Sequence, residues 1–222
     1  MNNATNTTVM TQLLFVVLLA LASMVGGVLY PIFYAIAFII PIALGMILAK
    51  GAGAELKNFF KVKKRDTSYL LPTAFPILLV IILVALLTSF LLSLIGKTNE
   101  VILYDTLFEN LVFHALLPAI FEELIFRYIP LITIARYSKK WAVIISALTF
   151  AAAHMNLFQI PYALLAGVLF MLIDIKAESV IPSVLLHLLN NSLSVLSLVY
   201  GIDTAIIISV AVLAAVSAVF IL

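Results

Sequence analysis

Three charged side chains lie close together in an otherwise apolar stretch, PAIFEELIFRYIP, at residues 118–130. Glu123 and Arg127 are spaced i,i+4, so on a helix they share a face and can form an ion pair. Glu122 points about 100° away from Glu123 around the helix, which leaves it without this partner. The spacing therefore predicts one carboxylate held in a structural ion pair and a second, Glu122, that is available for chemistry.

Two further apolar stretches carry isolated polar side chains. FAAAH ends at His154, and HLLNN contains His187, Asn190 and Asn191. His187 and Asn191 are spaced i,i+4 and share one helix face, whereas we expect Asn190 to face away from it and to be structural. An ionisable group inside a membrane span costs about 2.5–3.5 kcal/mol on insertion scales, and such groups usually serve function. Both stretches are therefore candidate parts of a functional site.

The chain that carries these residues has the composition of a membrane protein. Of its 222 residues, 65% are hydrophobic and 10% are charged, and the mean hydropathy is +1.29. A soluble domain is only about half apolar. The net charge of +2 is too small to indicate nucleic-acid binding, and the absence of cysteine excludes disulfides, thiolate metal sites and a cysteine nucleophile.

Eight apolar runs account for most of the sequence, and most suit a membrane-spanning helix of about 20 residues. We therefore expect an all-α, polytopic transmembrane helical bundle of about eight spans. It would form a single membrane-embedded domain over residues 1–222, with a motif-bearing core at about 105–200. The runs lie at residues 11–29, 30–49, 70–95, 107–135, 141–157, 161–175, 179–200 and 203–222.

Basic residues gather in the connections on one side of this expected bundle. If eight helices alternate from a cytoplasmic N-terminus, ten lysines and arginines fall on that side and only Lys97 falls on the other. This positive-inside pattern predicts an integral, multi-pass membrane protein with both termini in the cytoplasm and a cytoplasmic entrance to the site. The ten residues are Lys50, Lys57, Lys61, Lys63, Lys64, Arg65, Arg136, Lys139, Lys140 and Lys176.

The isolated polar residues fall at similar depths in three different spans. A helical rise of about 1.5 Å per residue places Glu122 and His154 each roughly 20 Å from the basic end, and Asn191 roughly 18 Å from it. Polar groups that meet at one depth are what a buried site requires. Pro118 removes the backbone donor that would bond the carbonyl of His114, which predicts a kink just before Glu122.

The three motifs, in their order along the chain, resemble those of a known family. EELIFR (EExxxR), FAAAH (FxxxH) and HLLNN (HxxxN) resemble the motifs of the CPBP family, the CAAX-processing and bacteriocin-processing intramembrane proteases, also called the ABI family. The resemblance covers roughly residues 105–200, and the first three spans match only in being apolar. It implies hydrolysis of a peptide bond in a membrane-associated substrate, either a CAAX-type prenylated tail or a bacteriocin or leader peptide.

The resemblance also implies a role for each motif residue. Glu122 would be the catalytic glutamate, and His154 would be its partner in holding a water molecule. His187 and Asn191 would form the pair that stabilises the oxyanion, and the ion pair of the first motif would support them. Amide hydrolysis needs a base for water and donors for the developing oxyanion, and these residue types supply both.

A metal-dependent mechanism is an alternative. One glutamate and two histidines, here Glu122, His154 and His187, form a plausible three-ligand zinc set with water as the fourth ligand. The sequence lacks HExxH, and each candidate ligand comes alone or paired with asparagine. We therefore expect no obligatory cofactor, with a divalent metal such as zinc as the alternative.

Two other classes of function stay open. Buried glutamate, histidine and arginine also form proton relays in proton- or ion-coupled transporters, although the sequence shows no convincing internal repeat of the kind such transporters carry. A catalytically silent immunity or binding protein would have the same fold. The partners expected in any case are the lipid bilayer and, for a protease, a membrane-anchored protein or peptide. The sequence does not specify the oligomeric state.

Overall fold

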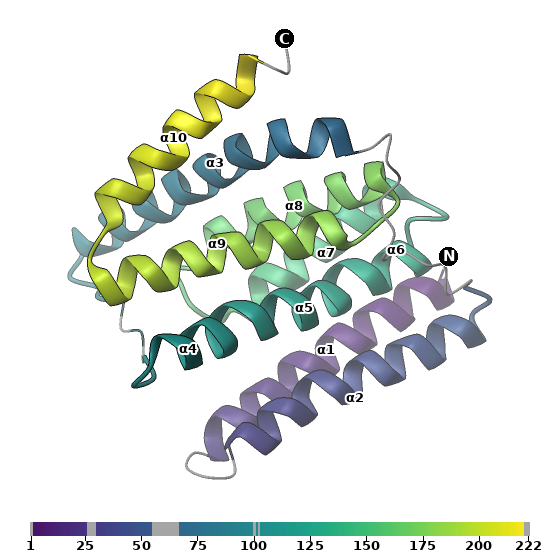
Figure 1. Ribbon diagram of the computed structural model, residues 1–222. Coiled ribbons are helices and arrows are strands. Elements are labelled where there is room, and N and C mark those ends of the chain that lie inside the picture. Colours follow the sequence, from purple (N-terminus) through teal and green to yellow (C-terminus); the bar gives the residue numbers. More distant parts are fainter. Residues whose placement is uncertain (1, 26–29, 55–66, 100, 102, 220–222) are drawn as a thin grey trace.

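The computed structural model describes residues 2–25, 30–54, 67–99, 101 and 103–219. Within these ranges the regular structure is helical and contains no strand, which confirms the expected all-α bundle (Figure 1). The helices are α1 (Asn2–Val25), α2 (Tyr30–Gly51), α3 (Thr67–Ser93), α4 (Leu107–Asn110), α5 (Leu117–Glu123), α6 (Ile129–Thr133), α7 (Lys139–Ala153), α8 (Ile160–Ala177), α9 (Ile181–Tyr200) and α10 (Asp203–Val219).

The helices α4, α5 and α6 are parts of one rod that runs over residues 107–133. Two π-helical segments, η3 (Leu111–Leu116) and η4 (Leu124–Tyr128), join them without a break. Each segment ends two residues before a proline, Pro118 or Pro130. A π-helical turn bonds residue i to i+5 and commonly marks a functional site. The distortion expected at Pro118 thus takes the form of a widened helical segment directly before the EELIFR motif.

The rods lie side by side along a common direction (Figure 1). α1 packs against α2 on one flank, and α3 packs against α10 on the other. The 107–133 rod, α7, α8 and α9 lie between these pairs, so the helices that carry the three motifs are the central ones. Five helices are long and apolar enough to cross a membrane by length and composition, namely Asn2–Val25, Ile32–Gly51, Pro72–Ser93, Ile160–Ala177 and Ile181–Tyr200.

The first helix begins earlier than the apolar run at 11–29 suggested. α1 starts at Asn2, and its threonines are buried against α6 rather than exposed. Thr8 Oγ1 donates to the carbonyl of Ala4 at 3.1 Å and lies 2.7 Å from Thr133 Oγ1, while Thr11 donates to the carbonyl of Thr7 at 2.8 Å. Because these bonds satisfy the hydroxyls, a polar segment can enter the helical core.

Aromatic side chains connect the flanking α1–α2 pair to the motif helices. The ring of Phe15 lies 5.0 Å from that of Phe38 and 5.5 Å from that of Phe126, which in turn lies 5.4 Å from Phe150. All four are at least 97% buried. Aromatic pairs at such separations add about 0.5–1.5 kcal/mol beyond the area that they bury, so this chain of rings holds the N-terminal pair against the centre.

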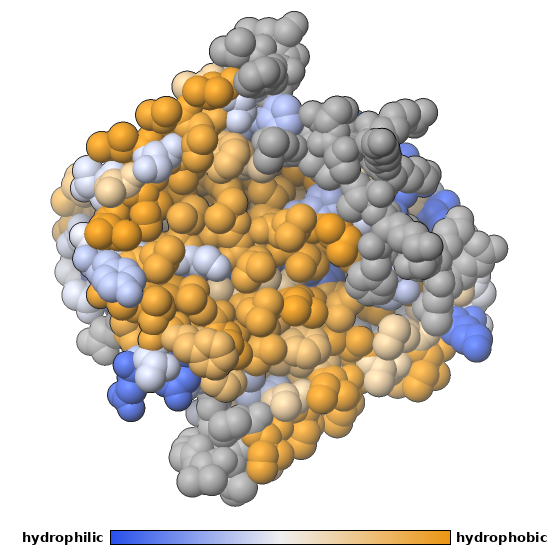
Figure 2. Space-filling model, viewed as in Figure 1, coloured by the Kyte–Doolittle hydropathy of each residue, from blue (hydrophilic) through white to orange (hydrophobic). Residues whose placement is uncertain are grey.

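The outside of the bundle is apolar, as a membrane protein requires. Figure 2 shows a face dominated by hydrophobic side chains, and the exposed ones include Leu83, Leu87 and Phe90 of α3. Exposed aromatic residues lie toward both ends, with Tyr137 and Trp141 at one and Tyr104 and Tyr200 at the other, as in the aromatic belts at membrane interfaces.

The connections that carry the basic residues converge at one end of the bundle. Arg136 donates to the carbonyls of Gly53 at 2.6 Å and Ala52 at 2.8 Å, which ties the α6–α7 connection to the end of α2. Lys57, Lys61, Lys63, Lys64 and Arg65 lie outside the described residues. The cytoplasmic placement of this end, and of both termini, stays a prediction.

Helices α7 and α8 approach each other closely at Gly167. A Cβ added there would lie 2.7 Å from Cα of Ala147, a backbone atom that cannot move aside alone. We expect Gly167→Ala to destabilise the folded protein by about 1–3 kcal/mol through overpacking, measured as a lower unfolding temperature in detergent. The matched control is Gly51→Ala, where an added Cβ meets nothing within 4 Å. Equal unfolding temperatures for the two variants would contradict this contact.

Candidate active site

The first motif contains a fully buried ion pair. Glu123 Oε2 lies 3.2 Å from Arg127 Nε, and both side chains have no exposed surface. The i,i+4 pair predicted from the sequence is therefore confirmed. A charge removed from water is costly unless it is paired. Each of these two residues therefore lowers the free-energy cost of burying the other.

Aromatic rings and a serine surround the guanidinium of Arg127. Its Cζ lies 4.3 Å from the ring centre of Phe150 and 5.8 Å from that of Phe170, both within reach of a cation–π interaction. Its Nη1 lies 3.4 Å from Ser146 Oγ, and that hydroxyl donates to the carbonyl of Phe126. The arginine is thus held between the 107–133 rod, α7 and α8.

The other oxygen of Glu123 holds His187 of α9. Glu123 Oε1 lies 2.8 Å from His187 Nδ1. Since an ion-paired carboxylate accepts hydrogen bonds, Nδ1 is the donor, and the bond turns Nε2 away from Glu123. Nε2 lies 3.9 Å from Glu122 Oε2, which is too long for a direct hydrogen bond. Glu123 therefore connects the arginine of the first motif to the histidine of the third, a contact that sequence reasoning did not foresee.

A second buried carboxylate braces the start of α9. The backbone N–H and hydroxyl of Ser183 donate to the two oxygens of Asp174 at 3.1 and 2.6 Å, and neither residue has exposed surface. Ser183 lies one helical turn before His187 on the same face. The end of α8 thus fixes the position of α9 next to the histidine.

His154 lies at the point where α7 ends. The helix runs to Ala153, and His154 is its C-terminal cap, followed by Met155 with a φ of 47°. Its Nδ1 lies 2.8 Å from the carbonyl of Phe150, which can only accept a hydrogen bond, so Nδ1 carries a proton. In the neutral ring Nε2 is then an acceptor, the form needed to hold a water molecule by its O–H.

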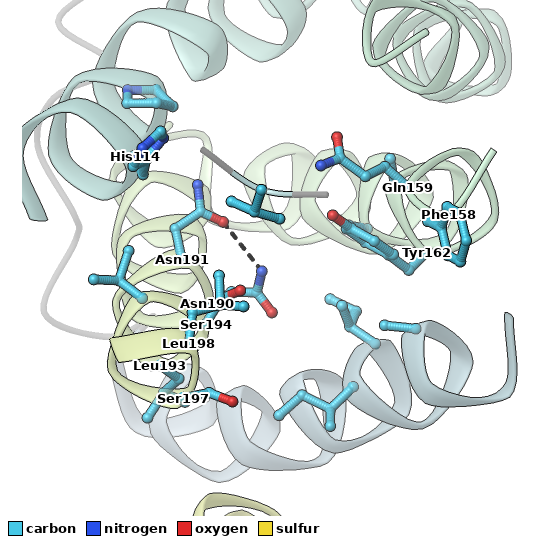
Figure 3. Close-up of a pocket in the computed structure, with 18 of the residues that line it drawn as sticks. His114, Phe158, Gln159, Tyr162, Asn190, Asn191, Leu193, Ser194, Ser197 and Leu198 are labelled. Atoms are coloured by element: carbon cyan, nitrogen blue, oxygen red, sulfur yellow. Dashed lines mark hydrogen bonds between the residues drawn. The ribbon is translucent and has the colours of Figure 1, made fainter. Parts of the chain in front are cut away.

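A cavity of about 450 Å³ brings the residues of the three motifs together (Figure 3). Its lining includes Glu122, His154, His187 and Asn191, from three separate helical rods. Glu122 keeps 17% of its side chain exposed, in contrast to its fully buried neighbour Glu123. The four residues to which the resemblance assigns catalytic roles therefore share one space, and the ion pair lies behind its wall.

The expected orientation of Asn190, away from the face of His187 and Asn191, was wrong, whereas its structural role stays a prediction. Asn190 lines the cavity, and its Nδ2 donates to Asn191 Oδ1 at 3.2 Å, the dashed line in Figure 3. It lies three residues after His187, and residues three apart share a helix face as those four apart do. That spacing was the signal by which the sequence alone would have placed it in the site.

Several lining residues had no signal in the sequence. Gln159 and Tyr162 face the α9 residues across the cavity in Figure 3, and Asn99 lines it from the connection before α4. Asn99 also accepts a hydrogen bond from Asn156 at 3.3 Å. They lie near helix ends and in connections, where polar residues are ordinary, so only the packing of the helices shows that they belong to the site.

The side chains do not form a ready metal site. Across the described ranges, no group of three or more His, Cys, Asp and Glu residues is arranged to hold a metal ion. Of the alternative set, Glu122, His154 and His187, both histidines use Nδ1 for bonds to the protein. These bonds leave Nε2 of both rings as the atom that could ligate, so the metal-dependent alternative stays a hypothesis.

One comparison with known proteins gives a match. Residues 105–193 match the family model described as Rce1-like: Type II CAAX prenyl endopeptidase Rce1-like. No curated protein and no solved structure matches the chain. The matched segment holds the 107–133 rod, α7, α8 and the motif residues of α9, so it is the part that builds the cavity.

The bundle places a glutamate, two histidines and an asparagine around one internal cavity. This arrangement suits hydrolysis within the bilayer. The match over residues 105–193 supports a CPBP-family intramembrane protease, the family that the three motifs predicted. At this level it supports the class of a membrane-embedded hydrolase that cleaves peptide bonds.

Removal of Arg127 tests the buried cluster. We expect Arg127→Leu to destabilise the protein by about 3–5 kcal/mol, because it leaves the Glu123 carboxylate buried without its cation. Adding Glu123→Gln should recover part of this loss, since the amide removes the unpaired charge. Thermal unfolding in detergent measures both variants, with the exposed Lys140→Leu as control. A double variant no more stable than Arg127→Leu would show that the charges are not coupled.

Proposed function

We propose that the protein is an intramembrane endopeptidase that hydrolyses a peptide bond with a water molecule activated by Glu122, without a metal. The observation that carries the proposal is the shared cavity of Glu122, His154, His187 and Asn191. The substrate would be a membrane-associated protein or peptide, either a CAAX-type tail or a bacteriocin or leader peptide. The family match supports the class of reaction.

Glu122 is the residue suited to act as the base. It reaches the cavity, retains exposure, and has the buried ion pair of its neighbour behind it. The Glu122 carboxylate takes a proton from water, and the oxygen attacks the peptide carbonyl carbon while His154 Nε2 holds the other hydrogen. When the tetrahedral intermediate collapses, the C–N bond breaks and Glu122 returns its proton to the leaving amine.

In the proposed reaction, Asn191 and His187 stabilise the oxyanion. Asn190 donates a hydrogen bond to Oδ1 of Asn191. The amide nitrogen of Asn191 is then the group of that side chain that can donate into the cavity. His187 donates from Nε2 only as an imidazolium, because Nδ1 already donates to Glu123. Loss of one such donor typically lowers the rate by about 10²–10³.

Substitution of Glu122 tests the proposed base. We expect Glu122→Gln to abolish cleavage of a panel of prenylated and unprenylated peptides, because the amide cannot accept a proton from water. The unfolding temperature should stay close to that of the wild type, since among the described residues Glu122 makes no direct hydrogen bond that the change would break and lies 3.9 Å from His187 Nε2. The matched control, Glu109→Gln, makes the same chemical change in the first turn of the same rod, where the half-buried Glu109 caps the helix with Thr106. A folded Glu122→Gln protein with wild-type activity would refute the mechanism.

Chelation tests the absence of a metal in the reaction. We expect the purified protein, incubated with EDTA or 1,10-phenanthroline and then separated from the chelator, to cleave at an unchanged rate. The reason is that the proposed steps use only side chains and water. A loss of activity that added zinc restores would instead support the metal-dependent alternative.

A further inference from the structure

The cavity occupies only one end of the bundle. On the 107–133 rod its lining residues run from Phe113 to Glu122, and on α8 they stop at Phe170. On α9 they begin at His187 and continue toward the end of that helix. In each case the lining lies toward one end of the bundle, on the left in Figure 1. The α3–α4, α7–α8 and α9–α10 connections lie at that end. We call this the mouth end.

Exposed residues of the lining show where the cavity opens. Leu103 is 38% exposed and Leu198 is 48% exposed, and Asn99 and Asp203 are exposed as well. These four lie in or next to the connections of the mouth end, and the exposed lining residues Leu86 and Ser89 of α3 and Ser194 of α9 lie in the halves of those helices nearest that end. α7 helps to make this space, because it has 15 residues where the neighbouring α9 has 20, a difference of about 8 Å in length.

The opposite end of the cavity is closed. Phe150, Phe170 and His187 are 2–5% exposed and form its floor. Below them lies the fully buried Glu123–Arg127 pair. Beyond that pair a second cluster of buried apolar residues, which includes Ile129, Ile132, Ala142, Met171 and Val180, fills the rest of the bundle.

The basic residues lie at this closed end. Among the described residues, Lys50 ends α2, Arg136 and Lys139 flank the α6–α7 connection, and Lys176 lies in the last turn of α8. Five more basic residues follow α2 in the sequence, outside the described residues. Of the residues that the structure describes, Lys97 is the one basic residue at the mouth end. By the positive-inside rule the closed end is the cytoplasmic one, so the cavity does not open where a cytoplasmic entrance was expected.

We propose that the substrate reaches Glu122 from the non-cytoplasmic side of the membrane, as an extended peptide segment presented at the outer surface. This inference rests on the proposed function and narrows its substrate class: exported peptides, or the outer segments of membrane proteins, rather than tails of cytoplasmic proteins.

The two walls of the cavity indicate the chemistry of that peptide. Asn190, Asn191 and Ser197 of α9 offer hydrogen bonds for a peptide backbone. A further wall, from α3 and α10, is mostly apolar, with Ile82 and Ile206 among its residues beside the polar Ser89 and Asp203. A volume of about 450 Å³ is in the usual range for ligand pockets. The cavity therefore suits a short extended segment with apolar side chains on the face turned toward α3 and α10.

Cysteine labelling tests the orientation without any need for activity. The chain has no cysteine, so single cysteines can be introduced by Asp203→Cys at the mouth end and Lys140→Cys at the closed end, both at exposed positions. A membrane-impermeant maleimide added to intact cells should label the first variant and should label the second only after permeabilisation. The reverse pattern would overturn the inference.

Cleavage in sealed vesicles tests the side from which the substrate enters. Proteoliposomes sorted by maleimide labelling receive a quenched peptide from outside, and we expect cleavage to scale with the fraction of molecules whose mouth end faces outward. A bulky maleimide on Asp203→Cys should lower the rate, and on Lys140→Cys it should not. Cleavage that scales with outward closed ends would refute entry from the mouth end.

The same peptide in detergent separates this inference from the proposed function. Both ends are accessible there, so wild-type cleavage with loss in Glu122→Gln establishes the protease whatever the sidedness. If no peptide is cleaved in detergent, the proposed function fails and the substrate inference fails with it, while the labelling result still decides which end faces outward.

Discussion

The buried carboxylate of Glu123 is the interaction on which the site depends. One oxygen pairs with Arg127 on the same rod and the other accepts from His187 on α9. A carboxylate without exposed surface is stable only while both neighbours stay in place. The pair therefore fixes the distance and rotation of α9 relative to the 107–133 rod, and it decides which histidine nitrogen faces the cavity.

This arrangement gives two adjacent glutamates opposite roles. Glu123 is fully enclosed, whereas Glu122 lies about 100° around the helix and reaches the cavity with 17% of its side chain exposed. The charges that hold the helices together also lie beneath the cavity floor, and with the aromatic residues they separate it from the basic end. The same cluster thus supports the proposed catalytic residues and closes the cavity toward the basic end of the bundle.

Much of the site followed from helical periodicity alone. The Glu123–Arg127 pair, the common face of His187 and Asn191, and their shared depth with Glu122 depend only on rise and rotation per residue. The same reasoning was applied incompletely to Asn190, three residues after His187. Hydropathy placed the start of α1 too late. The reason is that a hydropathy value does not account for hydroxyls that bond to the carbonyl one turn earlier.

The sequence by itself determined the all-α membrane bundle, the three motifs and the ion pair within one helix, since each depends on residues a few positions apart. Only the tertiary structure decided that Glu123 accepts from His187, 64 residues later in the chain, and that the cavity opens at the end opposite the basic connections. Helical periodicity predicts the face on which a side chain lies but not the helix that packs against that face. The packing of the helices determines that neighbour, through the aromatic contacts, the close approach at Gly167 and the early end of α7.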